Sequence, residues 1–155
     1  MARINQHDAP GVYNAMMAAQ QYVNQSGIDK KLHSLIMFRV SQINSCAYCL
    51  DMHFKDAIHE GETAQRLYSL NAWRETSYYT PQERAVLAFA EELTRLPEEK
   101  SSEHILDELL QYYTKEQIAN ITMAIVMINS WNRIVRAFGP VPGSYKVREA
   151  AASAN

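Results

Sequence analysis

The sequence has no apolar segment long enough to cross a membrane. No run of large apolar residues is longer than Ile125–Ile128, whereas a transmembrane helix needs roughly 20 such residues. The first residues, Met1–Asp8, contain no apolar stretch of the kind found in a signal peptide. These absences argue against a membrane protein and predict a cytoplasmic location.

A strong charge of one sign is also absent. The 155 residues carry a formal net charge of -2, and the basic residues form no stripe along the sequence. Nucleic acids and anionic membranes are bound by basic surfaces, so we expect neither as a partner. The length suits one domain. We expect a single domain over residues 1–155, with a core at about 10–140 and a mobile tail after about residue 143.

Glycine and proline are few, with five of each, and most lie near expected helix ends. No segment shows the sustained period-two alternation that is typical of strands. Apolar residues recur instead at helical spacing. The sequence therefore predicts an all-α helical bundle, with helices at about residues 10–23, 30–43, 46–60, 62–73, 81–96, 102–110 and 115–138.

Capping motifs mark two of these helix starts. Thr80–Glu83 and Thr114–Gln117 each place a threonine three residues before a glutamate or glutamine, which is the capping-box pattern. Gly139, followed by a proline, predicts the end of the last helix. Within that helix, Ile121–Ile128 is apolar on nearly all sides, which indicates a place in the core or, as the less common use, at a subunit contact.

Cysteine is scarce, and the only two cysteines lie close together. Cys46 and Cys49 form a CxxC pair, and His53 follows four residues later. In a reducing cytoplasm this spacing favours catalytic or metal-binding cysteines over a structural disulfide. On one helix, at about 100° per residue, the three side chains fall within an arc of about 60°. They therefore form a candidate site.

This candidate site combines thiol nucleophiles with a base. A thiolate can attack a peroxide O–O bond to give a sulfenic acid, and a neighbouring thiol then condenses with it to form a disulfide. The cycle requires no cofactor and no metal. Cys46, expected in the first helical turn, has the helix dipole to favour its thiolate, whereas Cys49 is closer to His53. The residues alone leave the attacking cysteine open.

The CxxC pair has two other interpretations. The cysteines can be packing residues in the core without a chemical role, or they can bind zinc. Cys46, Cys49 and His53 would then supply three ligands, and His33, His59 or another subunit would supply the fourth. A second CxxC or HxxxH pair, which structural zinc sites usually contain, is absent from the sequence. Both interpretations therefore rank below redox chemistry.

Residues 39–53 resemble the core motif of the AhpD-like, carboxymuconolactone decarboxylase family. The pattern R-x-S-Q-x-N-x-C-x-Y-C-x-x-x-H is much more specific than CxxC alone. Residues 70–74, 83–87 and 128–133 look like later blocks of the same family. The resemblance covers roughly residues 10–140.

The resemblance implies an all-helical homo-oligomer and, in the CxxC-bearing branch, alkylhydroperoxidase activity. By resemblance Cys49 attacks the peroxide, Cys46 resolves the intermediate to a disulfide, and His53 belongs to the proton relay. The expected partners are a small-molecule hydroperoxide and a dithiol reductant protein or thiol. The alternatives are a lactone decarboxylase, from a branch that generally lacks the cysteine pair, and a non-enzymatic oligomeric module that senses oxidation or binds zinc.

One position departs from the family pattern. Where the family relay commonly has a glutamate, twelve residues before the first cysteine, this sequence has Ser34. Serine carries no negative charge to orient His53, although its hydroxyl can position a water. A carboxylate from another helix, such as Glu83 or Glu91, is a candidate replacement. His33, next to Ser34, is a further candidate for the relay, although an exposed position is the commoner one for such a histidine.

Overall fold

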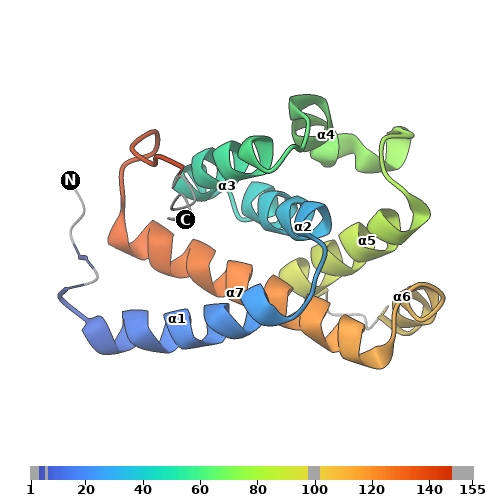
Figure 1. Cartoon of the computed structure of the whole chain (residues 1–155), viewed down its shortest axis with the longest axis horizontal. Coiled ribbons are helices and arrows are strands. Elements are labelled where there is room, and N and C mark those ends of the chain that lie inside the picture. The colour runs from blue at the N-terminus through green and yellow to red at the C-terminus, as the bar shows by residue number, and fades with distance from the viewer. Residues whose placement is uncertain (1–3, 6, 98–101, 148–155) are drawn as a thin grey trace, which may run out of the picture.

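The computed structural model describes residues 4–5, 7–97 and 102–147. All regular elements within these residues are helical (Figure 1). The elements are α1 (Pro10–Gln25), α2 (Lys30–Ile43), α3 (Ala47–His59), α4 (Ala64–Tyr68), the 3-10 helix η1 (Ser69–Glu75), α5 (Pro81–Arg95), α6 (Ser102–Leu109) and α7 (Lys115–Phe138). The all-α prediction is confirmed.

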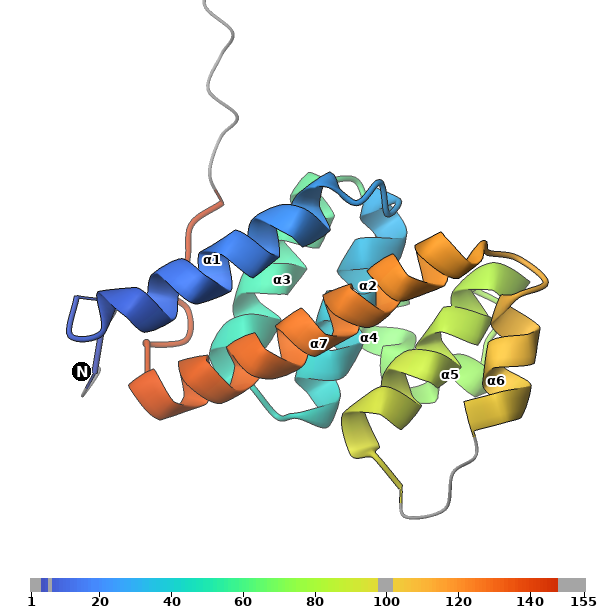
Figure 2. The same cartoon turned by 90° about the horizontal axis from the view of Figure 1, so that it is seen from below.

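Helix α2 lies at the centre of the bundle and contacts α3, α5 and α7. Helix α1 runs alongside α7 in both views (Figures 1 and 2). The position of α2 follows from its sequence, because its apolar residues lie on several sides and nine of its fourteen residues are buried. Two apolar clusters flank it. One joins it to α5 and α7, and the other, which includes Leu67, Leu70 and Trp73, joins it to α4 and η1.

The capping boxes at the starts of α5 and α7 are both present. The Thr80 hydroxyl accepts a hydrogen bond from the Glu83 backbone N–H at 3.2 Å, and the Glu83 carboxylate accepts one from the Thr80 N–H at 2.8 Å. Thr114 and Gln117 repeat this arrangement. Gly139 ends α7 with a left-handed φ of 69°, which glycine adopts without steric cost.

A Thr80→Ala variant is expected to lose about 1 kcal/mol of unfolding free energy, because the first turn of α5 loses its N-cap acceptor. Urea unfolding followed by circular dichroism measures this loss. Ser77→Ala, in the exposed turn before the helix, is the matched control and should match the wild type. Equal stability of the two variants would contradict the role of the cap.

Two helix boundaries differ from the sequence prediction. The expected helix over residues 62–73 is divided into α4 and η1, and Ala72 has a non-helical φ of −121°. Helix α3 begins at Ala47, so Cys46 is its N-cap and does not belong to its first turn. After α7, the Gly143 N–H donates to Asp51 on α3, and the Tyr145 hydroxyl donates to Asp56. The mobility expected after about residue 143 stays a prediction. Residues 148–155 lie outside the described residues.

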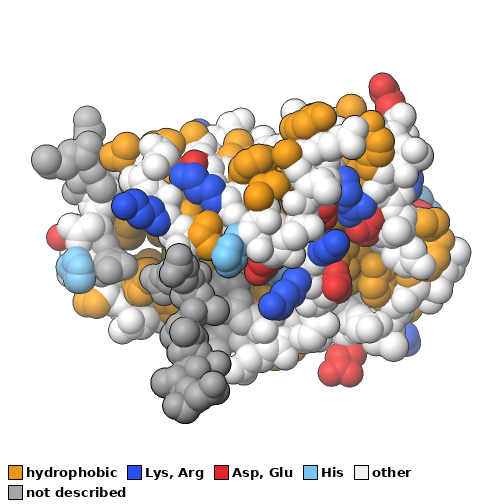
Figure 3. Space-filling model, turned by 45° about the horizontal axis from the view of Figure 1, so that its top comes forward, with side chains coloured by type: hydrophobic (Ala, Val, Ile, Leu, Met, Phe, Trp, Pro, Cys, Tyr) orange, Lys and Arg blue, Asp and Glu red, His pale blue; other side chains and the backbone are white. Residues whose placement is uncertain are grey.

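The apolar stretch of α7 is used mainly in the core. Of its residues, Ile121, Ile125 and Ile128 are buried, whereas Val126 is exposed. Other large apolar side chains, among them Tyr68 and Tyr78, also lie at the surface. Figure 3 shows hydrophobic side chains next to mixed acidic and basic ones on one face. Homo-oligomerisation stays a prediction.

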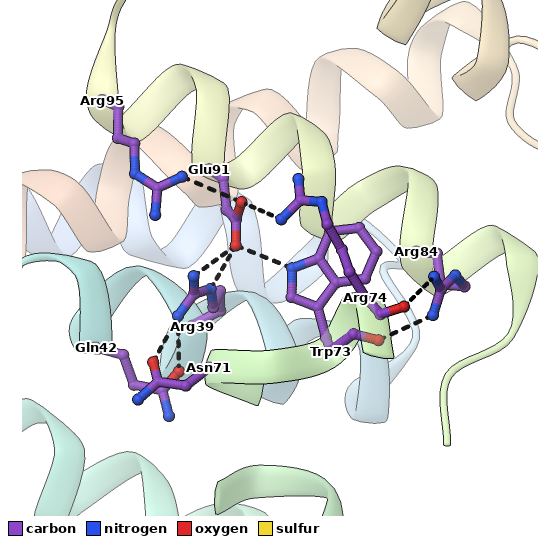
Figure 4. Close-up of polar contacts among 8 residues, drawn as sticks. All are labelled: Arg39, Gln42, Asn71, Trp73, Arg74, Arg84, Glu91 and Arg95. Carbon is purple, nitrogen blue, oxygen red and sulfur yellow. Dashed lines mark hydrogen bonds and ion pairs between the residues drawn. The ribbon is translucent and has the colours of Figure 1, made fainter. Parts of the chain in front are cut away.

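A buried polar cluster around Glu91 joins α2, η1 and α5 (Figure 4). One Glu91 carboxylate oxygen accepts hydrogen bonds from Arg39 Nε at 2.8 Å and from the Trp73 indole at 2.9 Å. The other accepts from Arg74 at 2.7 Å and from Arg95 at 3.2 Å. The Arg74 guanidinium also lies over the Trp73 ring, 4.1 Å from its centroid. The cluster therefore fixes η1 against the two helices that carry the core.

Candidate active site

Cys46 and Cys49 lie at the start of α3 and are joined by a disulfide bond. The turn before them contains Ser45, whose left-handed φ of 50° is uncommon for a residue with a side chain. Both cysteines are nearly inaccessible, with exposed fractions of 1% and 2%. Since Cys46 is the N-cap and Cys49 lies in the first turn, both sulfurs are at the positive end of the helix dipole. The expected place of Cys46 in the first turn is therefore wrong, and the helix dipole gives no reason to prefer Cys46 over Cys49.

The turn that carries Cys46 is fixed to α7 by polar contacts. The Asn44 side-chain amide donates to Asn129 and to Asn132, each at 2.9 Å. Asn132 in turn donates to the Ser41 hydroxyl at 3.1 Å, and Arg136 donates to the Asn44 carbonyl at 2.8 Å. We call these contacts the α2–α7 polar frame. The frame explains why asparagines recur in both motif blocks, residues 39–53 and 128–133.

A cavity of about 680 Å³ opens beside the disulfide. Cys49 and His53 both line it, whereas Cys46 is not among its lining residues. Most of the wall is apolar and comes from α1, α2, α3 and α7. It includes Met17, Met37, Met52, Ile128, Trp131 and Phe138. The cavity therefore gives an organic molecule access to Cys49 and to His53 at once.

The imidazole of His53 is held in its neutral form. Burial, together with the smaller effect of the nearby His33, lowers the pKa of His53 to about 3. At neutral pH such a histidine can accept a proton or donate its N–H, but it does not keep a positive charge. His53 is therefore suited to passing a proton and poorly suited to storing one.

The structure brings a carboxylate to Ser34 that the sequence analysis missed. Ser34 is buried, and its hydroxyl donates to Glu60 Oε2 at 3.2 Å. Glu60 is the C-cap of α3 and follows His53 by seven residues, so the two lie near one helical face. The seven-residue spacing from His53 to Glu60 was the one signal in the sequence that could have indicated Glu60. It became informative only because the structure places the end of α3 beside Ser34 on α2.

The carboxylates proposed as substitutes for the family glutamate are engaged elsewhere. Glu91 belongs to the buried cluster described above, and Glu83 forms an ion pair with Arg66 at 2.5 Å in addition to capping α5. Neither lines the cavity beside Cys49. His33, in contrast, does line it, and its Nε2 is buried without a hydrogen-bond partner in the described part of the chain. The expectation of an exposed His33 is therefore wrong.

The segment after α7 forms part of the cavity wall. Ser144, Tyr145 and Lys146 line the cavity, and Lys55 on α3 donates to the Tyr145 carbonyl at 3.0 Å. Ile4 and Asn5, before α1, also line it. Sequence periodicity gave no signal for these contacts, since both segments lack regular structure.

Neither a metal cluster nor a membrane span is found in the residues that the structure describes. No group of three or more histidine, cysteine, aspartate or glutamate side chains in residues 4–5, 7–97 and 102–147 is arranged to hold a metal ion. The zinc interpretation of Cys46, Cys49 and His53 therefore gains no support. None of the helices in these ranges has the length and apolarity needed to cross a bilayer.

Comparison with known proteins places this all-helical, CxxC-bearing chain in a family. It belongs to the carboxymuconolactone decarboxylase family, whose profile matches residues 10–92. An uncharacterized protein of Bacillus subtilis strain 168, YdfG, is 41% identical over 131 residues, which cover 84% of this chain and 89% of YdfG.

Solved structures share the fold over most of the chain. A protein of unknown function from Agrobacterium tumefaciens, described as an AhpD candidate for antioxidant defence, is 36% identical with a TM-score of 0.85, covering 96% of this chain and 100% of that one. The debrominase Bmp8 is 20% identical with a TM-score of 0.78, covering 90% of this chain and 75% of Bmp8. At that identity the second likeness shows the fold alone. The fold of this chain is AhpD-like.

Proposed function

We propose that this protein is a thiol-dependent hydroperoxidase in which Cys49 attacks, Cys46 resolves and His53 passes the proton. The observation that carries the proposal is the cavity that Cys49 and His53 line together, with Cys46 bonded to Cys49 behind it. Membership of a family with AhpD-like members supports the same conclusion. The position of Cys49 on the cavity wall favours it over Cys46 as the attacking sulfur.

The proposed reaction balances without a cofactor. The Cys49 thiol gives its proton to the relay, and the thiolate attacks the terminal oxygen of the hydroperoxide. The O–O bond breaks, Cys49 becomes a sulfenic acid, and the leaving alkoxide takes the proton to become an alcohol. The Cys46 thiol then displaces hydroxide from the sulfenic acid, so that the disulfide and one water form.

The size and lining of the cavity favour an organic hydroperoxide as the substrate. Hydrogen peroxide would leave most of a cavity of about 680 Å³ unfilled and would make few contacts with its apolar wall. An alkyl or aryl hydroperoxide would bury apolar surface there, which favours binding by roughly 25 cal/mol per Å². In this proposal, the apolar wall makes the protein prefer organic hydroperoxides over hydrogen peroxide.

Regeneration of the dithiol requires an external thiol, which we place in a reducing cytoplasm. A reductant thiolate attacks the Cys46–Cys49 disulfide and forms a mixed disulfide with the protein. The second thiol of the reductant then resolves that mixed disulfide. Because both sulfurs are nearly inaccessible, the attacking group must reach Cys49 through the cavity. A dithiol on a small molecule or on a protruding protein segment fits this requirement.

Thiol titration of the reduced protein tests the proposed function. One equivalent of cumene hydroperoxide should remove both thiols and produce one alcohol, because each turnover makes one disulfide. The same amount of hydrogen peroxide should react more slowly. Retention of both free thiols after exposure to cumene hydroperoxide would reject the proposal. Decarboxylation of a lactone that survives removal of both cysteines would support the decarboxylase alternative.

A further inference from the structure

We propose that His33 is a second histidine of the proton relay and that Glu60, held by Ser34, stabilises the proton there. This inference rests on the proposed function, because it assigns the proton that Cys49 releases. It gives Ser34 a defined task in place of the family glutamate. Ser34 positions a carboxylate that comes from the end of α3.

The first observation is the location of His33. It projects from α2 into the cavity that Cys49 and His53 line from α3. Its Nε2 is buried and has no hydrogen-bond partner within the described residues. A buried nitrogen without a partner costs free energy, so such a group in a reactive cavity calls for an explanation. A substrate oxygen in the cavity would supply the missing partner.

The second observation is the carboxylate behind this histidine. The Ser34 hydroxyl holds Glu60 Oε2 at 3.2 Å, and Ser34 is the next residue after His33. Burial lowers the pKa of His33, and the charge of Glu60 opposes that effect. At His53 no carboxylate of the described residues opposes the effect of burial, and its pKa falls to about 3. Of the two imidazoles, His33 is therefore the better proton store.

The proposed proton path neither gains nor loses atoms or net charge. The Cys49 thiol proton passes through His53 to His33, which is then positive beside the negative Glu60. The thiolate attacks the hydroperoxide, and the proton returns through His53 to the leaving alkoxide. The relay ends each cycle in its starting state.

Other titratable groups face the cavity and must be considered when the pH dependence of this relay is interpreted. The cavity wall carries tyrosines from α1, α3 and the segment after α7, together with one lysine. These groups are Tyr13, Tyr48, Tyr145 and Lys146. Asp56 lies close enough to Glu60 for the charge of Glu60 to contribute to its raised pKa, after burial. His33 and His53 are the two histidines among the residues that line this cavity.

The test compares His33→Gln with His104→Gln, an exposed histidine on α6. Reduced proteins are mixed rapidly with cumene hydroperoxide, and thiol loss is followed over a range of pH and hydroperoxide concentration. His33→Gln should lower the limiting rate about tenfold while leaving half-saturation unchanged, because general acid–base catalysis contributes about 10²–10⁴-fold and His53 remains. Rates for the two variants within about twofold across the pH range would overturn the proposal.

Glu60 provides an independent variant at an exposed position. Glu60→Gln should slow the reaction about threefold, because the proton on His33 loses the negative charge beside it. Ser34→Glu in the Glu60→Gln background should restore the rate, since it returns a carboxylate to the same place. A purely structural role for Glu60 predicts no such rescue, and absence of rescue with folded protein would count against the relay.

Alkylation separates failure of this relay from failure of the proposed function. In a Cys46→Ser background, the rate of Cys49 alkylation by iodoacetamide reports its thiolate without any hydroperoxide. His33→Gln should move the pH midpoint of alkylation upward, because the thiolate loses its positively charged partner. If hydroperoxide does not react with the wild type but this shift occurs, the proposed function fails and the relay stands. If the midpoint does not move, the relay is rejected.

Discussion

A Cys49→Ser variant is expected to lose hydroperoxide turnover by about a thousandfold or more, because the hydroxyl that replaces the thiol has no activating base strong enough to ionise it. Consumption of cumene hydroperoxide with a dithiol reductant measures the loss. The burial of both sulfurs prevents another thiol from taking over, since Cys46 lies outside the lining of the cavity.

Cys46→Ser is the matched variant, with the same chemical change three residues away. It should retain one rapid reaction with hydroperoxide and then stop, because the Cys49 sulfenic acid has no resolving thiol. Mass spectrometry after treatment with dimedone, which traps sulfenic acids, should find the adduct on Cys49. Turnover by Cys49→Ser together with an unreactive Cys46→Ser would reverse the two roles.

The second large effect concerns stability and lies outside the cavity. Glu91→Gln is expected to lower the free energy of unfolding by about 3 kcal/mol at neutral pH, because it leaves the buried Arg39 guanidinium without its counter-charge. Burial alone would raise the pKa of Glu91, but hydrogen bonds from Arg74, Trp73 and Arg39 lower it to about 2. Urea unfolding measures the difference.

The pH dependence of that difference has a definite sign. The pKa of Glu91 falls from an ordinary value of 4.5 to about 2 on folding, so its contribution is complete above pH 4.5 and is lost as the pH falls toward 2. The gap between the wild type and Glu91→Gln should therefore narrow in acid. Glu108→Gln, an exposed change on α6, should show no gap at any pH. A Glu91→Gln protein as stable as the wild type would contradict the assignment.

Helix ends were predictable from sequence because their signals are local. Thr80 and Thr114 bond to residues three positions away, and Gly139 needs only its own backbone freedom. The CxxC spacing and the histidine after it were also visible in the sequence. Of these residues, Cys49 and His53 line one cavity from α3, whereas Cys46 is the N-cap and lies outside that lining. The role of Cys49 and that of Cys46 came from a resemblance and are still predictions.

The relations that sequence reasoning missed join distant residues. Glu91 meets Arg39 across 52 positions, and Ser34 meets Glu60 across 26. No periodicity encodes such pairs, so the sequence could suggest only carboxylates on other helices, Glu83 and Glu91. The carboxylate that Ser34 contacts is that of Glu60. The split at Ala72 also had no signal in the local sequence.

The α2–α7 polar frame has a consequence for the energy of the redox cycle. Asn44 and Asn132 fix the backbone just before Cys46, and the Cys46 N–H donates to the Ser41 carbonyl at 3.1 Å. With the main chain held on one side and α3 on the other, we expect reduction of the disulfide to rotate the two cysteine side chains and to leave the main chain in place. The reduced dithiol would then meet its substrate in a cavity that already has its shape, because little of the main chain would need to move.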